Sequence, residues 1–542
     1  MRIPLRYHIP FLLLACFLVF FLHLDVLYAN IMEARNFITA REMLRDGHWI
    51  LTTMNGEARY EKPPLPTWLA AISGGVFGIG KLWALRLPSA LISTFLALFF
   101  YRFVGYVTKS KEQAFNASLI LITSFYILFS GRNGTWDIFA HAFMLAGIYY
   151  IFRFFAEAEK AYKNALLAGL FIGLSFMSKG PVSHFALLLP FLIAYGVVYR
   201  FRGFSKKILP FIAMMIMILI LSSWWAIAIY LLDTHAATAI ADKEAAAWAG
   251  HNTRPFYYYW SFFTQSGVWT IPAFVGLLYP YLRSRVTNLT AYRFSLWWTL
   301  AAVVLLSLIP EKKSRYLLPV LIPLAMNTSF YIGYLFKNFK DLTDKRETWP
   351  VYFNYGLIGV IALAVPFAGY LLLRENLNGL WGWFIPFSIV AIGIGVYLFL
   401  SLRRKRIANV FYTTVFFMCM IVTLGFPLVH ATYTNVDYAA PKPEVEAIGE
   451  KEIPQYVFNN GSPELLWDLG QTMPVVERPE GLQLPKESKF AIWINQLDQQ
   501  RFLETFEDYT IISKQKVDGN ITSKADRNYK ERRIAYVYVL EK

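Results

Sequence analysis

The chain has 542 residues, of which 56% are hydrophobic and only 16% are charged. Soluble domains carry about a quarter of charged residues, so this composition excludes an ordinary soluble enzyme and indicates a polytopic membrane protein. The net charge of +16 is then typical of basic cytoplasmic loops, which disfavours nucleic acid as a partner. The two cysteines, Cys16 and Cys419, lie in apolar runs, which disfavours a disulfide framework or a thiolate metal site.

Residues 1–430 contain repeated apolar segments, and we predict an α-helical transmembrane domain there. About thirteen spans satisfy the usual length of roughly 17 to 25 residues. The predicted spans are residues 8–29, 83–104, 114–130, 136–155, 163–178, 182–199, 208–230, 266–282, 291–309, 316–336, 351–373, 381–401 and 408–430. Every second loop is basic, which places the N-terminus in the cytoplasm and the C-terminal segment on the outer face.

Residues 31–81 form the first long polar loop, on the predicted outer face. Within it, Phe37, Arg41 and Leu44 recur at helical spacing, which predicts an amphipathic helix at the membrane interface. Gly47 would close this helix. A connector between two spans does not need so many charges, so we expect this loop to form half of an active site.

Several bases on the predicted outer face break the orientation rule, which makes them candidates for binding an anionic ligand. Arginine offers paired N–H donors to phosphate, and lysine offers a point charge. The bases are Lys62, Lys179, Lys312, Lys313 and Arg315. Two carboxylates near predicted helix ends, Glu33 and Asp137, would orient or deprotonate an acceptor. Together these residues predict transfer from a phosphorylated lipid.

Each of these residues also has a structural interpretation. Glu33 could pair with Arg35 or cap an interfacial helix. Asp137 could cap the span that follows it, and Lys179 could end a helix, since acids are favoured at helix N-termini and cations at C-termini. The bases at 312–315 could be anchors that extend to the membrane interface.

Residues 431–542 change to a mixed-charge composition, and we predict a small extracytoplasmic α/β domain there. Short strands are predicted at 455–458, 474–476, 490–494, 509–512 and 534–540, and helices at 463–470 and 499–506. No metal or nucleophile motif is visible in this part of the sequence, so we interpret it as an accessory domain.

Four motifs follow one another in the chain: MEARNFITAREMLRDGHWILTTMNGEARYEKPPLPTW at 32–68, ALRLPSA at 84–90, SKGP at 178–181 and KSRYLLPVLIPLA at 313–325. As an ordered set they resemble the bacterial integral-membrane glycosyltransferases of the type C fold, which use polyprenyl-phosphate sugars. The 4-amino-4-deoxy-L-arabinose (lipid A) transferases are the most similar branch, and the protein O-mannosyltransferases are more distant. The resemblance implies a membrane helical domain with an outer C-terminal domain.

The resemblance also implies roles for individual residues. Lys62 matches the lysine that contacts the donor phosphate, and Asp137 matches an acidic residue of the second outer loop. The usual Asp-Glu pair of the first loop reads Met32-Glu33 here, so the first carboxylate role would fall on Glu33 or on Asp25. The supporting residues are Arg35, Arg59 and Glu61. The sequence establishes no cofactor, and the resemblance implies a divalent metal as an option, with Glu61 and His251 as its candidate ligands.

We therefore expect a hexosyl- or pentosyltransferase of the bacterial inner membrane. It would move a sugar from a polyprenyl-phosphate donor to a lipid A-like lipid or another envelope acceptor on the periplasmic face. A protein O-glycosyltransferase is one alternative, and a transporter or flippase of a lipid-linked anion is another. Transporters concentrate polar residues near the middle of the membrane, whereas the charges here lie in loops on one face, which favours the enzyme.

Overall fold

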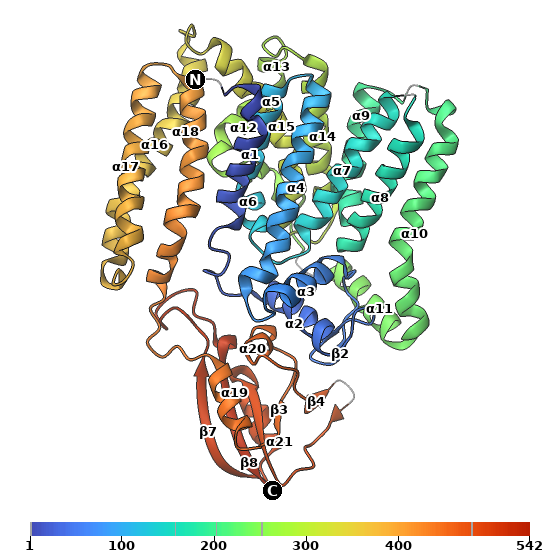
Figure 1. The fold of residues 1–542 in the computed structure, drawn as a ribbon, viewed down its shortest axis with the longest axis vertical. Coiled ribbons are helices and arrows are strands. Elements are labelled where there is room, and N and C mark those ends of the chain that lie inside the picture. Colours follow the sequence, from blue (N-terminus) through green and yellow to red (C-terminus); the bar gives the residue numbers. More distant parts are fainter. Residues whose placement is uncertain (1–2, 158, 202, 251–252, 479–480) are drawn as a thin grey trace.

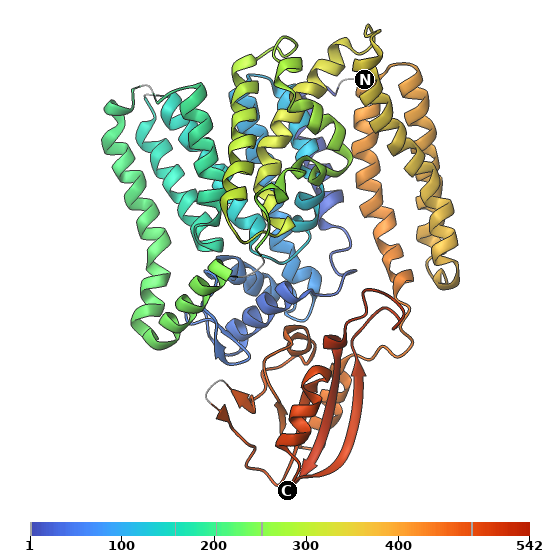
Figure 2. The same ribbon diagram turned by 180° about the vertical axis from the view of Figure 1, so that it is seen from behind.

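A computed structural model describes residues 3–157, 159–201, 203–250, 253–478 and 481–542. Long helices form one body, and a small sheet domain lies beyond one end of it (Figures 1 and 2). The N-terminus lies at the opposite end of the helical body from this domain. The protein is thus a helical membrane body with a C-terminal α/β unit.

Eight helices among the described residues are long and apolar enough to cross a membrane, or nine if one bent pair forms a single span. The chain is therefore a multi-pass membrane protein, whereas the count of about thirteen spans stays a prediction. The eight contain α4 (Leu82–Thr108), α7 (Asp137–Ala156), α10 (Ile208–Leu232), α14 (Leu289–Leu308), α15 (Leu321–Asn338), α16 (Lys345–Leu373), α17 (Trp381–Arg403) and α18 (Ile407–Met420). Helices α8 (Ala161–Lys179) and α9 (Leu189–Val198) complete the body beside them.

Three predicted spans are broken in the structure. The N-terminal one begins with α1 (His8–Cys16) and continues as a helix only to Phe21, after which residues 22–30 form a turn, a bend and irregular backbone. The second consists of α5 (Lys111–Ile122) and α6 (Phe125–Gly131), which meet at 70°. The third is divided among a 3-10 segment, α12 (Thr270–Gly276) and α13 (Tyr279–Leu282).

Local chemistry explains two of these breaks. The hydroxyls of Thr123 and Ser124, between α5 and α6, donate to backbone carbonyls of the preceding turn. Such bonds compete with the helix ladder and bend the chain. Gly267 precedes α12 with a φ of 66°, a conformation that favours glycine. Apolar length alone therefore overestimates the continuous spans.

The first loop contains α2 (Ile31–Arg45), a hairpin of β1 (Thr53–Met54) and β2 (Glu57–Ala58), and α3 (Leu65–Phe77). With α11 (Thr234–Gly250) it lies at the end of the helical body that faces the C-terminal unit (Figures 1 and 2). The predicted helix is confirmed, and it ends just before Gly47, whose φ is 76°. Its polar residues Arg41 and Glu42 are buried along with its apolar ones, so the place at the membrane interface stays a prediction.

The C-terminal unit has a four-stranded sheet in the order β3-β6-β8-β7, in which β3 runs parallel to β6 and the other neighbours are antiparallel. Its strands are β3 (Gln455–Val457), β6 (Lys489–Asn495), β7 (Thr510–Asp518) and β8 (Ile534–Glu541), and β4 (Glu477–Arg478) pairs with β5 (Gly481–Leu482). Its helices are α19 (Pro441–Gly449), α20 (Pro463–Asp468) and α21 (Gln499–Thr505). The predicted α/β class is confirmed, but the strand expected at 474–476 contributes only a single bridge, Val475 to Val457.

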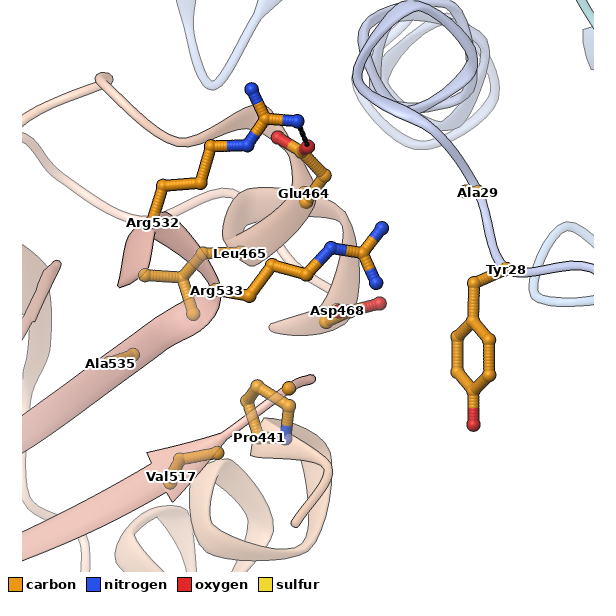
Figure 3. Close-up of a pocket in the computed structure, with 11 residues that line it drawn as sticks. Tyr28, Ala29, Pro441, Glu464, Leu465, Asp468, Val517, Arg532, Arg533 and Ala535 are labelled. Carbon is orange, nitrogen blue, oxygen red and sulfur yellow. Dashed lines mark ion pairs between the residues drawn. The ribbon is translucent and has the colours of Figure 1, made fainter. Parts of the chain in front are cut away.

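The C-terminal unit is attached to α2 through buried arginine chemistry. The Arg41 guanidinium, only 2% exposed, donates to the carbonyls of Leu466, Trp467 and Gln471. These carbonyls lie at the C-terminal end of α20, where a cation is favourable. Burial lowers the pKa of Arg41 to about 10, so it stays charged at neutral pH. A small cavity of about 20 Å³ lies beside this contact, with Tyr28 on one wall (Figure 3).

We predict that Arg41→Ala loosens this junction. Three buried carbonyl groups would lose a charged donor, which costs about 1–3 kcal/mol of stability. Hydrogen exchange of the amides at 466–473 should accelerate. Arg45→Ala is the matched control, because Arg45 makes an exposed bond to Gly470 and should have a smaller effect. Unchanged exchange in the Arg41 variant would contradict this attachment.

Candidate active site

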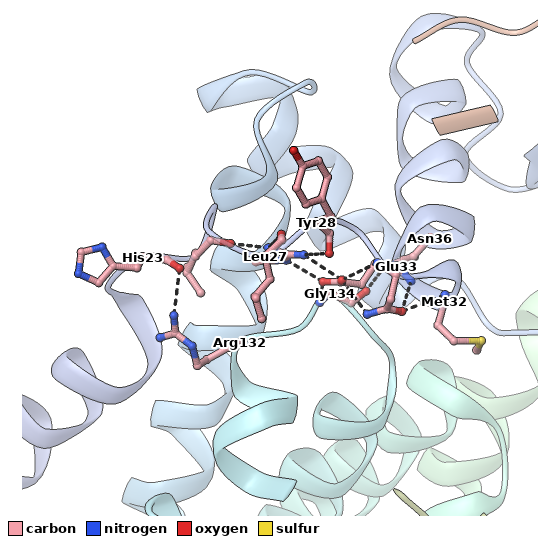
Figure 4. A network of polar contacts seen from close by, with 11 residues as sticks. His23, Leu27, Tyr28, Met32, Glu33, Asn36, Arg132 and Gly134 are labelled. Carbon is pink, nitrogen blue, oxygen red and sulfur yellow. Dashed lines mark hydrogen bonds and ion pairs between the residues drawn. The ribbon is translucent and has the colours of Figure 1, made fainter. Parts of the chain in front are cut away.

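Glu33 lies in the first turn of α2 and is 1% exposed. Its carboxylate accepts two bonds from the Arg86 guanidinium, from Nε at 2.7 Å and from Nη2 at 2.9 Å. It also accepts the backbone N–H of Gly134 at 2.8 Å and both N–H groups of Asn30, with which it forms a capping box (Figure 4). The capping role is confirmed, and the buried partner is Arg86 rather than Arg35.

Two arginines fix residues 22–30, the irregular segment that precedes α2. Arg86 donates to the carbonyls of Leu24, Leu27 and Tyr28, in addition to its bonds with Glu33. Arg132 donates to the carbonyls at residues 19, 22 and 23 (Figure 4). Backbone outside a helix or sheet needs such partners when it is buried. The segment after the first helix is therefore built on arginine side chains.

The loop before α7 depends on this network. Gly134 donates its N–H to Glu33, and its carbonyl accepts from the Asn36 amide at 2.8 Å. A Cβ at Gly134 would lie 2.4 Å from the Phe37 ring, so only glycine permits this approach. Glu33 thus positions the loop that leads into Asp137. The Glu33 carboxylate is fully engaged in these contacts. Asp25, the alternative candidate for the first carboxylate, is an exposed residue of the segment 22–30.

Asp137 and Lys179 form a second ion pair, between α7 and α8. Asp137 is the first residue of α7 and Lys179 the last of α8, so each charge lies at the helix end that favours it. Their side chains are 12% and 10% exposed. One turn further along α7, His141 is hydrogen-bonded to Ser183 at 2.8 Å, which fixes the chain just beyond Lys179.

Further bases surround this pair. The Lys179 ammonium lies 5.8 Å from the centre of the Tyr316 ring, within cation–π range. Arg315 and Lys62 lie within electrostatic range of Lys179. The Arg315 Nε is buried without a hydrogen-bond partner among the described residues. The structure thus brings together Asp137, Lys179, Arg315 and Lys62, which were predicted to lie on the same face.

Lys62 lies at the open side of the cluster. Its ammonium is 2.9 Å from the Glu244 carboxylate of α11, and its side chain is 28% exposed. This pair is easily exchanged, because partly exposed ion pairs contribute little stability. Glu244 was not singled out from the sequence, since nothing in its local pattern connects it with Lys62.

Arg59 fixes the segments that carry the cluster. Its guanidinium donates to the Arg35 carbonyl and the Thr39 hydroxyl, both at 2.9 Å, and lies 5.3 Å from the Trp136 ring. It therefore ties α2 to the residue just before Asp137. Burial lowers the pKa of Arg59 to about 10, so it remains charged at neutral pH.

Lys312 is placed differently from its neighbours Lys313 and Arg315. The Lys313 ammonium lies 5.8 Å from the centre of the Tyr316 ring, the same ring that the Lys179 ammonium and the Arg315 guanidinium approach. The Lys312 ammonium is buried and donates to the carbonyls of Ile309 and Arg254. Lys313 pairs with Glu311 at 2.6 Å. Lys312 thus stabilises its own loop, and the structure does not bring its ammonium to the Asp137 cluster. The three residues carry the same positive charge, so their charge alone could not predict these different roles. The direction in which each side chain points decides them.

Glu61 is the one of the two candidate metal ligands that the structure describes. Its carboxylate faces Arg59, with Oε2 3.8 Å from Nε, and His251 lies outside the described residues. Among the described residues, the one group with potential metal-binding spacing is Glu42, Asp46 and His48. Glu42 already accepts bonds from the hairpin residues Thr53, Asn55 and Gly56. The Oε2 atom of Glu61 is buried without a hydrogen-bond partner among the described residues, and a divalent metal there stays a prediction.

Residues 61–227 match the family of dolichyl-phosphate-mannose-protein mannosyltransferases, a segment that contains Lys62, Asp137 and Lys179. One similar protein is an undecaprenyl phosphate-alpha-4-amino-4-deoxy-L-arabinose arabinosyl transferase of Aeromonas hydrophila, 27% identical over 338 residues. Another is an uncharacterized protein of Aquifex aeolicus, 26% identical over 301 residues. These alignments cover 60% and 54% of this chain and 59% and 58% of the two proteins, so the chain spans less than two thirds of their length.

The structure superimposes on ArnT from Cupriavidus metallidurans bound to undecaprenyl phosphate, with a TM-score of 0.71 and 16% identity over 98% of this chain and 97% of ArnT. This chain has the type C glycosyltransferase fold. The predicted resemblance to the polyprenyl-phosphate-sugar-dependent membrane glycosyltransferases is thus confirmed. The fold also accounts for the grouping of Lys62, Asp137 and Lys179 at one end of the helical body.

We predict that Glu33 and Arg86 are coupled in stability. Removing either partner leaves a buried charge alone, so Glu33→Ala and Arg86→Ala should each cost about 3–5 kcal/mol. The double variant should cost clearly less than the sum of the two. Reversible unfolding in detergent measures this cycle. A Glu33→Ala protein with wild-type stability would contradict the positioning role and return Glu33 to the list of candidate bases.

Proposed function

We propose that this protein is an inner-membrane glycosyltransferase that takes a sugar from a polyprenyl-phosphate donor. The acceptor would be a lipid A-like lipid or another envelope component, and the site would face the periplasm. The observation that carries the proposal is the Asp137–Lys179 pair, with the further bases Lys62 and Arg315 beside it from two other segments. A site of this composition on a type C fold suits a leaving group that is a lipid phosphate.

The bases would act on the departing phosphate. When the bond between the anomeric carbon and the phosphate oxygen breaks, negative charge grows on that oxygen. Lys62, Lys179 and Arg315 lie where they can stabilise this charge, and preorganised cations do so without reorganisation cost. Arg315 would contribute through its N–H groups, and the lysines as point charges.

Asp137 would act on the acceptor. An acceptor hydroxyl attacks the anomeric carbon, a new C–O bond forms, and the hydroxyl proton passes to the Asp137 carboxylate. A single displacement inverts the anomeric centre and releases polyprenyl phosphate. In the free protein the Lys179 ammonium is paired with the Asp137 carboxylate. The donor phosphate must draw this ammonium away before the carboxylate can accept a proton.

Transfer in detergent tests the enzyme against a transporter. Purified protein is incubated with a panel of undecaprenyl-phosphate sugars and envelope lipids, and the products are analysed by mass spectrometry. We expect a glycosylated lipid and free undecaprenyl phosphate, although no membrane separates two compartments. Peptide acceptors in the same panel test protein O-glycosylation. No transfer with any donor would contradict the proposal and favour transport of a lipid-linked anion.

We predict that Lys62→Ala raises the KM for the donor by about ten- to a hundredfold. The variant loses a charged contact to phosphate, which contributes about 1.5–3 kcal/mol. Glu244→Gln is the matched control, because it frees Lys62 from its carboxylate partner and should leave the donor KM equal or lower. Initial rates over a range of donor concentrations measure both. An unchanged KM in the Lys62 variant would remove this residue from the donor site.

We predict that Asp137→Asn lowers kcat about 10²- to 10⁴-fold for a hydroxyl acceptor, because the amide cannot take the proton. Asp233→Asn provides a comparison, since Asp233 accepts a bond from Tyr60 and lies outside the cluster. Thermal unfolding of both variants separates loss of chemistry from loss of the fold. A folded Asp137 variant with normal kcat would exclude Asp137 as the base.

A further inference from the structure

A groove lies between α17 and α18, away from the candidate active site. Its volume is about 470 Å³, within the range of roughly 300–1,000 Å³ typical of small-molecule sites. Helix α17 lies at the edge of the helical body, and its turn into α18 is at the end that carries the N-terminus (Figures 1 and 2). The groove therefore opens on the surface that faces lipid.

The deeper part of the groove is apolar. Val390 and Gly393 of α17 line it, opposite Phe416 of α18. A Cβ at Gly393 would meet no heavy atom within 4 Å, so the glycine leaves open space. Two of the residues that line the groove form a polar pair. Asn409 donates its amide N–H to the Tyr397 hydroxyl at 2.8 Å across the groove.

The turn that closes this helix pair is strongly basic. Arg403, Arg404 and Arg406 are exposed at it. Lys405 differs, because its ammonium donates to the carbonyls of Lys340 and Leu342 and so fixes the turn to the neighbouring loop. In that loop Asp344 is used as the cap of α16, where it accepts the N–H of Arg346. The exposed charge at the mouth of the groove is therefore positive.

The order of these features along α17 matches one kind of molecule. Tyr397 lies six residues before Arg403, which is about 9 Å along a helix, and Val390 lies a further ~10 Å deeper. A phosphate at the arginines would place glycerol esters near the Tyr397–Asn409 pair and an acyl chain along Gly393. We propose that the groove binds an anionic glycerophospholipid of the inner leaflet, consistent with the way basic pockets between spans recognise anionic headgroups.

Other occupants fit less well. A second copy of the chain packed on this face would bring its own three arginines to the same turn, and like charges oppose such contact. A polyprenyl phosphate has no ester groups for the polar pair. The proposal is independent of the glycosyltransferase function, because no residue of the Asp137 cluster takes part in it.

Native mass spectrometry of the full chain with equal amounts of phosphatidylglycerol and phosphatidylcholine tests the charge. We expect phosphatidylglycerol adducts in roughly tenfold excess or more, since each base near the surface adds favourable attraction. R403Q/R404Q/R406Q should abolish this preference. K160Q/K163Q/K206Q changes the charge equally at exposed lysines of other loops and should retain it. Equal retention of the two lipids by the unmodified protein, or the same loss in both triple variants, would overturn the proposal.

Filling the groove tests the place of binding. G393F puts a ring into the open space and should reduce phosphatidylglycerol retention several-fold. G382F is the matched control, because Gly382 lies on the same helix, outside the groove, and is equally unobstructed. Undiminished retention in G393F would overturn the proposal. So would a dimer, or a bound polyprenyl phosphate, that is lost specifically in this variant.

Discussion

The buried ion pair between Glu33 and Arg86 is the interaction on which the candidate site depends. Both side chains are almost inaccessible to solvent, and each makes further hydrogen bonds. The pair therefore joins α2, α4, the segment 22–30 before α2 and the loop at Gly134. Removing one partner of such a pair is costly because the other charge stays buried. The position of Asp137 at the start of α7 follows from this arrangement, since its loop is bonded to Glu33.

The candidate cluster around Asp137 is built from helix ends. Asp137 begins α7 and Lys179 ends α8, so the two helix dipoles stabilise the two charges before they meet. Lys62 and Arg315 then approach from separate loops. This arrangement leaves the charges at the end of the helical body, as the proposed lipid-phosphate donor would require.

The consecutive residues Arg41, Glu42 and Met43 of α2 each contact a different neighbouring part of the structure. Arg41 binds the carbonyls at the end of α20, Glu42 holds the β1–β2 hairpin, and Met43 is fully buried against Ala40 and α3. Consecutive helix residues point in different directions, so one short motif can join three structural units. The C-terminal unit is thereby connected to the helix that also carries Glu33, which links an accessory domain to the support of the active site.

The sequence by itself determined the membrane class, a helix in the first polar loop, the α/β nature of the C-terminal unit, and the grouping of Lys62, Asp137, Lys179 and Arg315 on one face. These follow from hydropathy, periodicity and the distribution of charge in loops, all of which are local. Only the tertiary structure decided that Glu33 pairs with Arg86, that Lys62 pairs with Glu244, and that Lys312 serves its own loop. The residues of the first two pairs are 53 and 182 positions apart, and the choice among several available charges depends on side-chain direction and burial, which no local pattern records.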